Sequence, residues 1–246
     1  MRIINADDFG LSLEVNEAID QCFLQKLINQ TTLVVNMPFT KDAVERSIKH
    51  GYAENVGLHL NLVEGNPLTE AIKHTKLCDK EGCFNENLIR DRFNRLFLDS
   101  RTRKAVRDEI EAQIKRYLDY GFTLRHIDSH EHTHTNLSII PLLVPILKKY
   151  GFKSIRLTRN IPPQEICGLK SIYKHILNMY LIRKNKASIQ YSKIRFFGSL
   201  TDTESSKKDI QIYQELMVHP VLHSNMIIDA ICKYNIVEWE QQNISK

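Results

Sequence analysis

Short apolar runs alternate with longer amphipathic segments along most of the chain. The short runs are β-branched or alternate apolar with polar residues, which is typical of strands. The segments between them repeat apolar positions every three or four residues, as helices do. We therefore predict strands at 2–6, 31–37, 56–62, 124–128, 153–159, 193–200 and 215–220, with helices that include 13–28, 40–51, 87–98, 103–120 and 137–151.

Strands separated by helices favour parallel βαβ units. Seven or eight such units in 246 residues predict an α/β fold, a TIM-barrel-like (β/α) barrel that is incomplete or distorted. We expect residues 1–246 to form a single domain. A doubly wound open sheet is the alternative, but the glycine-rich GxGxxG pattern that would support a dinucleotide fold does not occur in the chain.

Composition is that of an ordinary globular protein, with 42% apolar and 26% charged residues. No run approaches the ~20 consecutive apolar residues of a membrane span. The N-terminal residues lack the apolar stretch of a secretory signal peptide. The five cysteines are scattered and odd in number, which fits a reducing environment. These features predict a cytoplasmic protein that does not interact with membranes.

Positive charge is concentrated in one part of the chain. Between Lys148 and Arg195 there are twelve Lys or Arg residues and a single acid, Glu165, although the formal net charge is only +5. The segment is either a solvated face or a surface for an anionic ligand such as a phosphorylated substrate. Nucleic acid is not expected as a partner, because no basic helix or aromatic RNA-binding pattern accompanies the charge.

Polar residues cluster where four of the predicted strands end. In parallel α/β folds, the catalytic groups come from these carboxyl ends, which meet at one rim. Singly, each residue has a plainer interpretation as a helix cap, a core histidine or a solvated loop. Together they predict one site, built from Asp7 and Asp8, His59, the tract His126–His134 and His219.

The tract HIDSHEHTH places four histidines, one aspartate and one glutamate in nine positions. On a strand, His126, Asp128 and His130 share one face. A row of polar groups contradicts a packed core, since burying each one unpaired would cost ~1–3 kcal/mol. Two imidazoles with a carboxylate are a common set for a catalytic divalent metal that keeps a position open for water. A free aspartate could act as a general base, which predicts a metal-assisted hydrolase of an amide or ester.

Four motifs in this order give the chain a family resemblance. NADDFG at 5–10, GLHLNL at 57–62, HIDSHEHTH at 126–134 and ELMVHP at 215–220 resemble the YdjC-like carbohydrate deacetylases, which include the chitooligosaccharide deacetylases. The resemblance implies a (β/α) barrel hydrolase that acts on a linear amide C–N bond. It would remove N-acetyl groups from N-acetylglucosamine-containing oligosaccharides, including phosphorylated disaccharides. It further implies a small acetylated sugar as the partner, magnesium as the usual metal and a homodimer.

The resemblance also assigns roles to residues. Asp7 matches the catalytic base and His219 matches the acid. Asp8, His59 and His130 match the ligands of one divalent ion, which we expect to be Mg²⁺ or Zn²⁺ because imidazole also suits softer metals. Four further residues would line or brace the site, namely Asp128, His132, His134 and Glu215.

Two positions depart from the family pattern. Glu131 stands where the family often has a histidine, and on a strand it would point away from the metal. Val221 stands where a glycine usually follows the HP pair, so the turn after His219 is expected to differ. Two other functions remain open: a barrel-type phosphoesterase with a second metal, and a sugar-binding protein without turnover.

Overall fold

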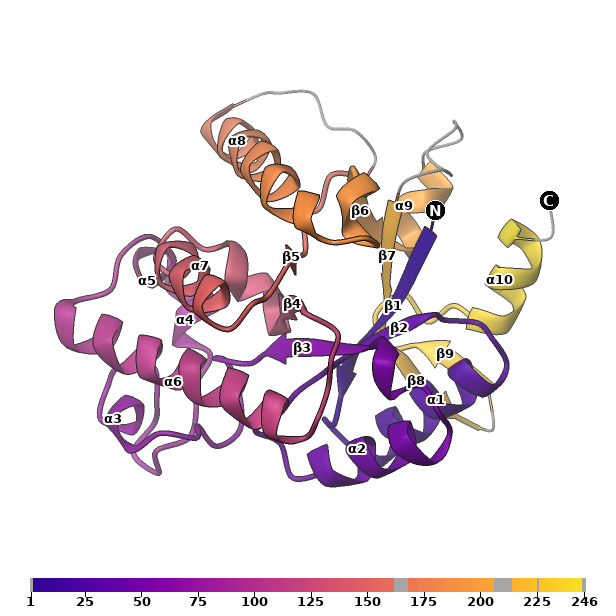
Figure 1. Ribbon diagram of the computed structural model, residues 1–246, viewed down its shortest axis with the longest axis horizontal. Coiled ribbons are helices and arrows are strands. Elements are labelled where there is room, and N and C mark those ends of the chain that lie inside the picture. Colours follow the sequence, from indigo (N-terminus) through magenta and orange to yellow (C-terminus); the bar gives the residue numbers. More distant parts are fainter. Residues whose placement is uncertain (1, 162–167, 206–213, 225, 245–246) are drawn as a thin grey trace.

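A computed structural model describes residues 2–161, 168–205, 214–224 and 226–244 and shows one curled sheet with helices around it (Figure 1). Within these residues the sheet has seven parallel strands in the order β5-β4-β3-β2-β1-β7-β6. This is the strand order of a barrel that is open between β5 and β6, so the predicted incomplete (β/α) barrel is confirmed. The strands are β1 (Arg2–Phe9), β2 (Gln30–Leu33), β3 (Val56–Leu60), β4 (His126–Ser129), β5 (Ser154–Ile155), β6 (Phe196–Ser199) and β7 (Gln214–Val218).

Helices lie outside the curl of the sheet (Figure 1). In the described ranges the α-helices are α1 (Leu13–Leu24), α2 (Thr40–Lys49), α3 (Glu70–Lys73), α4 (Asn87–Arg90), α5 (Arg92–Leu96), α6 (Ser100–Asp119), α7 (Ile140–Lys149), α8 (Gly168–Lys184), α9 (Leu200–Ser205) and α10 (Ile236–Ile244). Short 3₁₀ turns are η1 (Ala53–Asn55), η2 (His130–Thr135), η3 (Asn185–Ala187) and η4 (Tyr191–Lys193).

The first helix begins as predicted and ends earlier. Ser12 caps α1, because its hydroxyl accepts a hydrogen bond from the amide of Val15. The helix was expected to reach residue 28, but it ends at Leu24. Lys26 has φ = 59°, in the left-handed region where helices commonly stop.

The interior of the curl is polar, unlike the branched apolar filling common in TIM barrels. Residues that alternate along each strand separate the two faces of the sheet. One set, which includes Ile4, Ala6 and Leu58, is apolar and buried. The other set is buried and polar, and its members bond to one another across strands: Asn5, Asp7, Thr32, His59, Asp128, Arg156 and Glu215.

Side-chain amides satisfy the backbone where the barrel is open. Asn185 accepts from the amide of Ile155 and donates to its carbonyl, at 2.9 and 2.8 Å. Asn178 does the same for Thr158, at 2.7 and 3.1 Å. On the opposite side, Asn160 accepts from the amide of Phe197 at 2.8 Å. These amides replace the missing neighbouring strand, which otherwise would leave edge groups unpaired.

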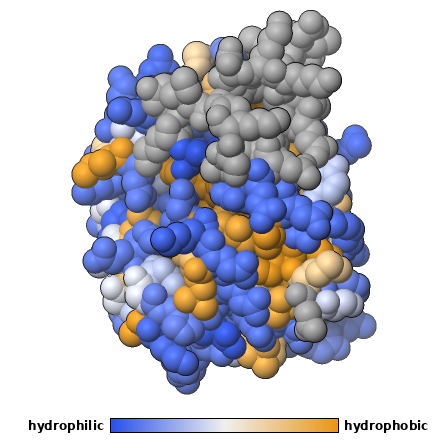
Figure 2. Space-filling model, turned by 90° about the vertical axis from the view of Figure 1, so that its right-hand side faces the viewer, coloured by the Kyte–Doolittle hydropathy of each residue, from blue (hydrophilic) through white to orange (hydrophobic). Residues whose placement is uncertain are grey.

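An antiparallel hairpin of β8 (Pro220–His223) and β9 (Met226–Asp229) follows the last parallel strand and packs on α1. Figure 2 shows the face with this hairpin and α10, where hydrophobic surface gathers between hydrophilic regions. Met226 in β9 and Ile231 just after that strand are exposed, at 49% and 68%. None of the described helices combines the length and the apolar character that crossing a bilayer requires.

Candidate active site

A bulge at the end of β1 turns two adjacent aspartates toward the same rim. The pairing of β1 with β2 matches Ala6 to Thr31 and Phe9 to Leu33, so β1 has one residue more than its partner between these points. Asp8 has φ = 69°, which a residue without glycine's freedom rarely adopts. In a regular strand, neighbouring side chains point to opposite faces. The bulge explains how both carboxylates can serve one site.

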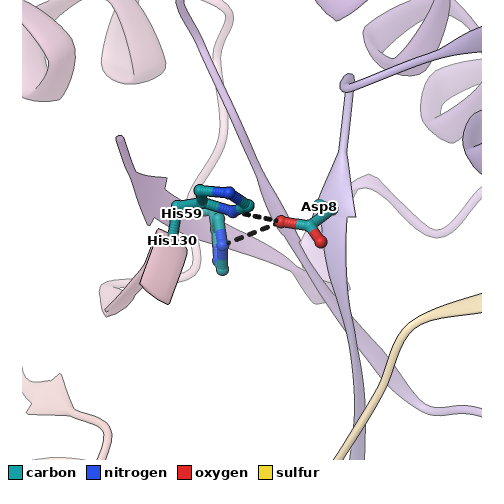
Figure 3. A group of neighbouring side chains, drawn as sticks. All are labelled: Asp8, His59 and His130. Atoms are coloured by element: carbon teal, nitrogen blue, oxygen red, sulfur yellow. Dashed lines mark hydrogen bonds and ion pairs between the residues drawn. The ribbon is translucent and has the colours of Figure 1, made fainter. Parts of the chain in front are cut away.

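Asp8, His59 and His130 converge at the carboxyl ends of β1, β3 and β4 (Figure 3). Oδ1 of Asp8 lies 2.8 Å from Nδ1 of His130 and 3.1 Å from Nε2 of His59. One ligand atom from each residue lies within 4.8 Å of the other two. The structure thus brings together the three residues predicted as metal ligands.

His130 reaches this position by a route that differs from the prediction. The strand β4 ends at Ser129, so His130 does not share a strand face with Asp128. Glu131 and His132 have φ values of 51° and 54°, and they carry the chain sharply into η2. The predicted strand face shared by His126, Asp128 and His130 is therefore wrong for His130. Glu131 nevertheless lies exposed at the surface, because of the left-handed turn rather than strand alternation.

His59 is fixed between two carboxylates. Its Nδ1 lies 2.7 Å from Oδ1 of the fully buried Asp128, which also accepts from Thr32 at 2.9 Å. Burial by itself lowers the pKa of His59, but Asp128 and Asp8 outweigh it and raise this pKa to about 10. The pKa of His130 is likewise raised to about 9, since Asp8 and Glu64 outweigh burial.

These residues fit a divalent metal ion. Nε2 of His59 is buried, and among the described residues it has no partner in hydrogen-bonding geometry, although Asp8 lies close. Such an orphan nitrogen, next to a second imidazole and a carboxylate, matches the donor set of a catalytic metal. Without metal, protons hold the cluster together, so metal uptake would release them.

Asp7 is bound at both oxygens by Arg156, a residue that the sequence reasoning missed. Nη1 and Nη2 of Arg156 donate to Asp7 at 2.6 and 2.8 Å, and both residues are buried. Burial alone would raise the pKa of Asp7, but Arg156 outweighs it and holds this pKa well below its usual range. Arg156 stands inside the basic segment that was interpreted as surface; Glu165, the one acid of that segment, lies outside the described residues.

Arg156 also restricts where a cation can bind. Among the described residues, two further groups have metal-ligand spacing: Asp7, His59 and Asp128, and His126, Asp128 and Glu215. The guanidinium contacts Asp7, Asp128 and Glu215 at 2.6–2.7 Å. The guanidinium thus lies next to carboxylates of both groups, and its positive charge would repel a metal ion there. Among the described residues, this leaves the group of Asp8, His59 and His130 as the one suited to a metal.

His219 lies where β7 passes into the hairpin. Its amide donates to Asp229 at 2.8 Å, and its Nδ1 lies 3.8 Å from the same carboxylate oxygen. Burial lowers the pKa of His219, but Asp229, Asp7 and Asp8 outweigh it, and the result is a raised pKa. Val221, at the usual glycine position, pairs with Ile228 in the hairpin, so the chain continues as a strand there.

The remaining predicted site residues His132, His134 and Glu215 lie close to Arg156. His134 is fully buried, with Nδ1 2.6 Å from the Ser129 hydroxyl and Nε2 3.2 Å from the Arg156 carbonyl. His132 packs edge-on against Phe197, and burial and Arg156 lower its pKa to about 3. Burial raises the pKa of Glu215 to about 7, although Arg156 opposes this.

Comparisons with known proteins agree with this fold. The sequence model of the family described as "YdjC-like protein" matches residues 2–243. A crystal structure of an Enterococcus faecalis protein, whose name refers to cellobiose-phosphate cleavage, superimposes with a TM-score of 0.66. It covers 90% of this chain and 81% of that protein at 21% identity, which supports the fold alone.

Several similar proteins carry the name carbohydrate deacetylase. The one from Thermoanaerobacter pseudethanolicus is 28% identical over 92% of this chain and 83% of its own length. The one from Clostridium beijerinckii is 32% identical over 72% and 68%. The one from Vibrio cholerae is 37% identical over 60% of this chain, a match that spans 55% of the relative.

Proposed function

Because the chain belongs to the YdjC-like protein family, we propose that it is a carbohydrate deacetylase that uses one divalent metal ion. Its substrates would be oligosaccharides that contain N-acetylglucosamine, of the diacetylchitobiose type. The observation that carries the proposal is the convergence of Asp8, His59 and His130 beside the ion-paired Asp7. The names of the relatives from Thermoanaerobacter, Clostridium and Vibrio support the reaction class.

Asp8, His59 and His130 would hold the metal. A divalent ion, Mg²⁺ or Zn²⁺, supplies Lewis acidity toward the acetyl carbonyl and lowers the pKa of water. Two imidazoles favour a borderline metal such as Zn²⁺, whereas family resemblance favours Mg²⁺. Asp128 keeps the His59 ring in place through its Nδ1, as carboxylates commonly do for metal-bound histidines.

Asp7 and His219 would perform the two proton transfers. Asp7 is ionised at neutral pH and can take a proton from the attacking water, whose oxygen bonds to the acetyl carbon. His219, whose pKa is raised by Asp229, can give its proton to the amide nitrogen as the C–N bond breaks. The products are acetate and a free amino sugar.

Cations near the rim would favour a phosphorylated sugar. Tyr173 on α8 donates to the carbonyl of Thr135, at the end of the turn that carries His130, at 2.6 Å. This contact brings the first turns of α8 to the rim. Burial is the largest cause that lowers the pKa of Lys174, and the nearby cations Lys170 and Arg159 lower it further. An anionic substituent on the sugar would pair with cations on this side of the rim.

The test is acetate release by the purified protein, with Mg²⁺ or Zn²⁺ added, from diacetylchitobiose and its 6-phosphate. We expect release that EDTA abolishes, faster turnover of the phosphorylated sugar and one metal bound per chain. His59→Ala should lose both metal and activity. Two metals per chain, with phosphate ester cleavage instead of acetate release, would favour the phosphoesterase alternative. Sugar binding without acetate release would contradict an enzyme.

A further inference from the structure

Glu64 contacts the nitrogen of His130 that faces away from the metal-binding group. Its Oε1 lies 3.0 Å from Nε2 of His130, while Nδ1 of that ring lies 2.8 Å from Asp8. His59 shows the same arrangement, since one nitrogen faces Asp8 and the other faces Asp128. Each candidate imidazole ligand is therefore placed between the ligand carboxylate and a second carboxylate.

The loop after β3 holds Glu64 in place. The side-chain oxygen of Asn61 accepts from the amides of Val63 and Glu64, at 3.0 and 3.2 Å. Its Nδ2 donates to the carbonyl of Glu64 at 2.9 Å. Gly65 follows with φ = 72°, and a Cβ there would lie 2.6 Å from Sδ of Met37. Both neighbours of Glu64 along the loop are thus constrained.

A buried carboxylate anchors the far end of this loop. Glu109 on α6 is fully buried and accepts from the amides of Leu68 and Thr69, at 2.8–3.0 Å, and from the Thr69 hydroxyl at 2.7 Å. The amide of Phe84 also donates to the carbonyl of Gly65 at 2.9 Å. The backbone position of Glu64 therefore does not depend on its own contact with His130.

We propose that Glu64 is a positioning residue for His130. Its carboxylate would accept a hydrogen bond from the Nε2–H group of His130. The proton would then stay on Nε2, and the lone pair of Nδ1 would face an ion beside Asp8. This inference rests on the proposed function, because it assumes a metal at Asp8, His59 and His130. Carboxylates that accept from metal-bound histidines fix the tautomer and ring orientation and increase ligand basicity.

A merely structural ion pair is the plainer explanation for this contact. The Glu64 side chain is 42% exposed, and exposed ion pairs contribute little to stability. Since the loop is already anchored by Asn61 and Glu109, removing the carboxylate should leave the fold intact. Loss of metal affinity without loss of metal-free stability would therefore separate positioning from structure.

The test uses metal-free protein and titration calorimetry with Zn²⁺ and Mg²⁺. Glu64→Ala should raise the Kd about 10–100-fold, the usual effect of losing such a partner. Glu64→Gln keeps an oxygen that can accept a hydrogen bond from Nε2–H, so its Kd should lie close to that of the unaltered chain. Glu86→Gln is the matched control, because Glu86 is equally exposed, at 42%, and pairs with Arg90 instead. Its Kd should equal that of the unaltered chain.

Nitrogen-15 NMR of the His130 ring supplies an independent measurement. At a pH above the raised pKa of His130, where the metal-free ring is neutral, we expect the Nε2-protonated tautomer in the unaltered chain and in Glu64→Gln, and a mixture in Glu64→Ala. An unchanged Kd in Glu64→Ala would overturn the inference while leaving the proposed function intact. If Glu64→Ala and Glu64→Gln lose the same metal affinity, the effect comes from the charge of Glu64 alone, and the inference would also be overturned. If the unaltered chain binds no divalent ion, the proposed function itself fails.

Discussion

Arg156 donates hydrogen bonds to both oxygens of the Asp7 carboxylate and so keeps it ionised, as a general base must be before it takes a proton. A neutral amide at this position cannot take a proton from water, although it fills the same volume. We expect Asp7→Asn to lower kcat by about 10²–10⁴-fold, the usual contribution of a general base. Metal affinity should remain within a few-fold, because Asp8 rather than Asp7 belongs to the ligand group.

Kinetics and titration calorimetry on the same Asp7→Asn preparation check both expectations. The buried guanidinium loses its charged partner in this variant, so a thermal melt is needed to show that the barrel remains folded. Full activity in a folded variant would refute the role of Asp7 as the base. Loss of metal together with activity would instead place Asp7 among the ligands.

Asp229 is one of the carboxylates that raise the pKa of His219, which leads to a pH prediction. A proton donor works only below its own pKa, so kcat should fall as pH rises through the pKa of His219. That pKa is raised because Asp229, Asp7 and Asp8 outweigh burial. Asp229→Asn removes one raising charge, so the alkaline limb of the kcat profile should move to lower pH. Profiles from pH 5 to 10 would show this shift; a limb that stays in place would exclude His219 as its source.

The sequence predicted most of the candidate site residues near strand ends, but it missed Arg156 and the residues that come from a loop or a hairpin. Asp8 and His59 could be found because parallel strands end at one rim. Arg156 follows the same rule after β5, but it lies in a basic run that suggested a surface. Glu64 and Asp229 reach the site from a loop and a hairpin, whose paths no strand rule specifies.

At the scale of elements, the parallel strands of an incomplete barrel followed from the alternation of strands and helices, whereas the place of the opening did not. The break between β5 and β6 depends on asparagines that replace a strand. Single amides in a helix carry no pattern that periodicity can detect. The tract after Ser129 was also misjudged, because left-handed residues such as His132 end a strand without any glycine.

Asn185 should contribute measurably to stability at this opening. Its side chain pairs with both the amide and the carbonyl of Ile155, and all these groups are buried. Asn185→Ala would leave them unpaired, at a cost of about 1–3 kcal/mol in the free energy of unfolding. Urea denaturation measures this loss, with Lys186→Ala as the control at the exposed neighbouring position. Equal stabilities for the two variants would contradict a role for the amide.

At the scale of the whole molecule, the candidate ligands connect parts of the barrel that are far apart in sequence. Asp8 and His59 lie near the ends of β1 and β3, and His130 directly follows β4, while α1, α2 and α6 lie between them along the chain. An ion that binds the folded chain and not the unfolded one stabilises it, by about 2.7 kcal/mol at a hundred times its Kd. For a domain of this size, that corresponds to a rise in Tm of roughly 5–10 °C.

This stabilisation should depend on pH, because the ion competes with protons for the same imidazoles. Protons hold the metal-free cluster together, since the nearby carboxylates raise the pKa values of His59 and His130. The rise in Tm on adding Zn²⁺ should therefore be larger at pH 8 than at pH 6. His59→Ala should show little rise at either pH. If the Tm of this variant rises as much as that of the unaltered chain, the ion stabilises the fold from another site. In that case hydrogen bonds and ion pairs alone would hold the three strand ends together.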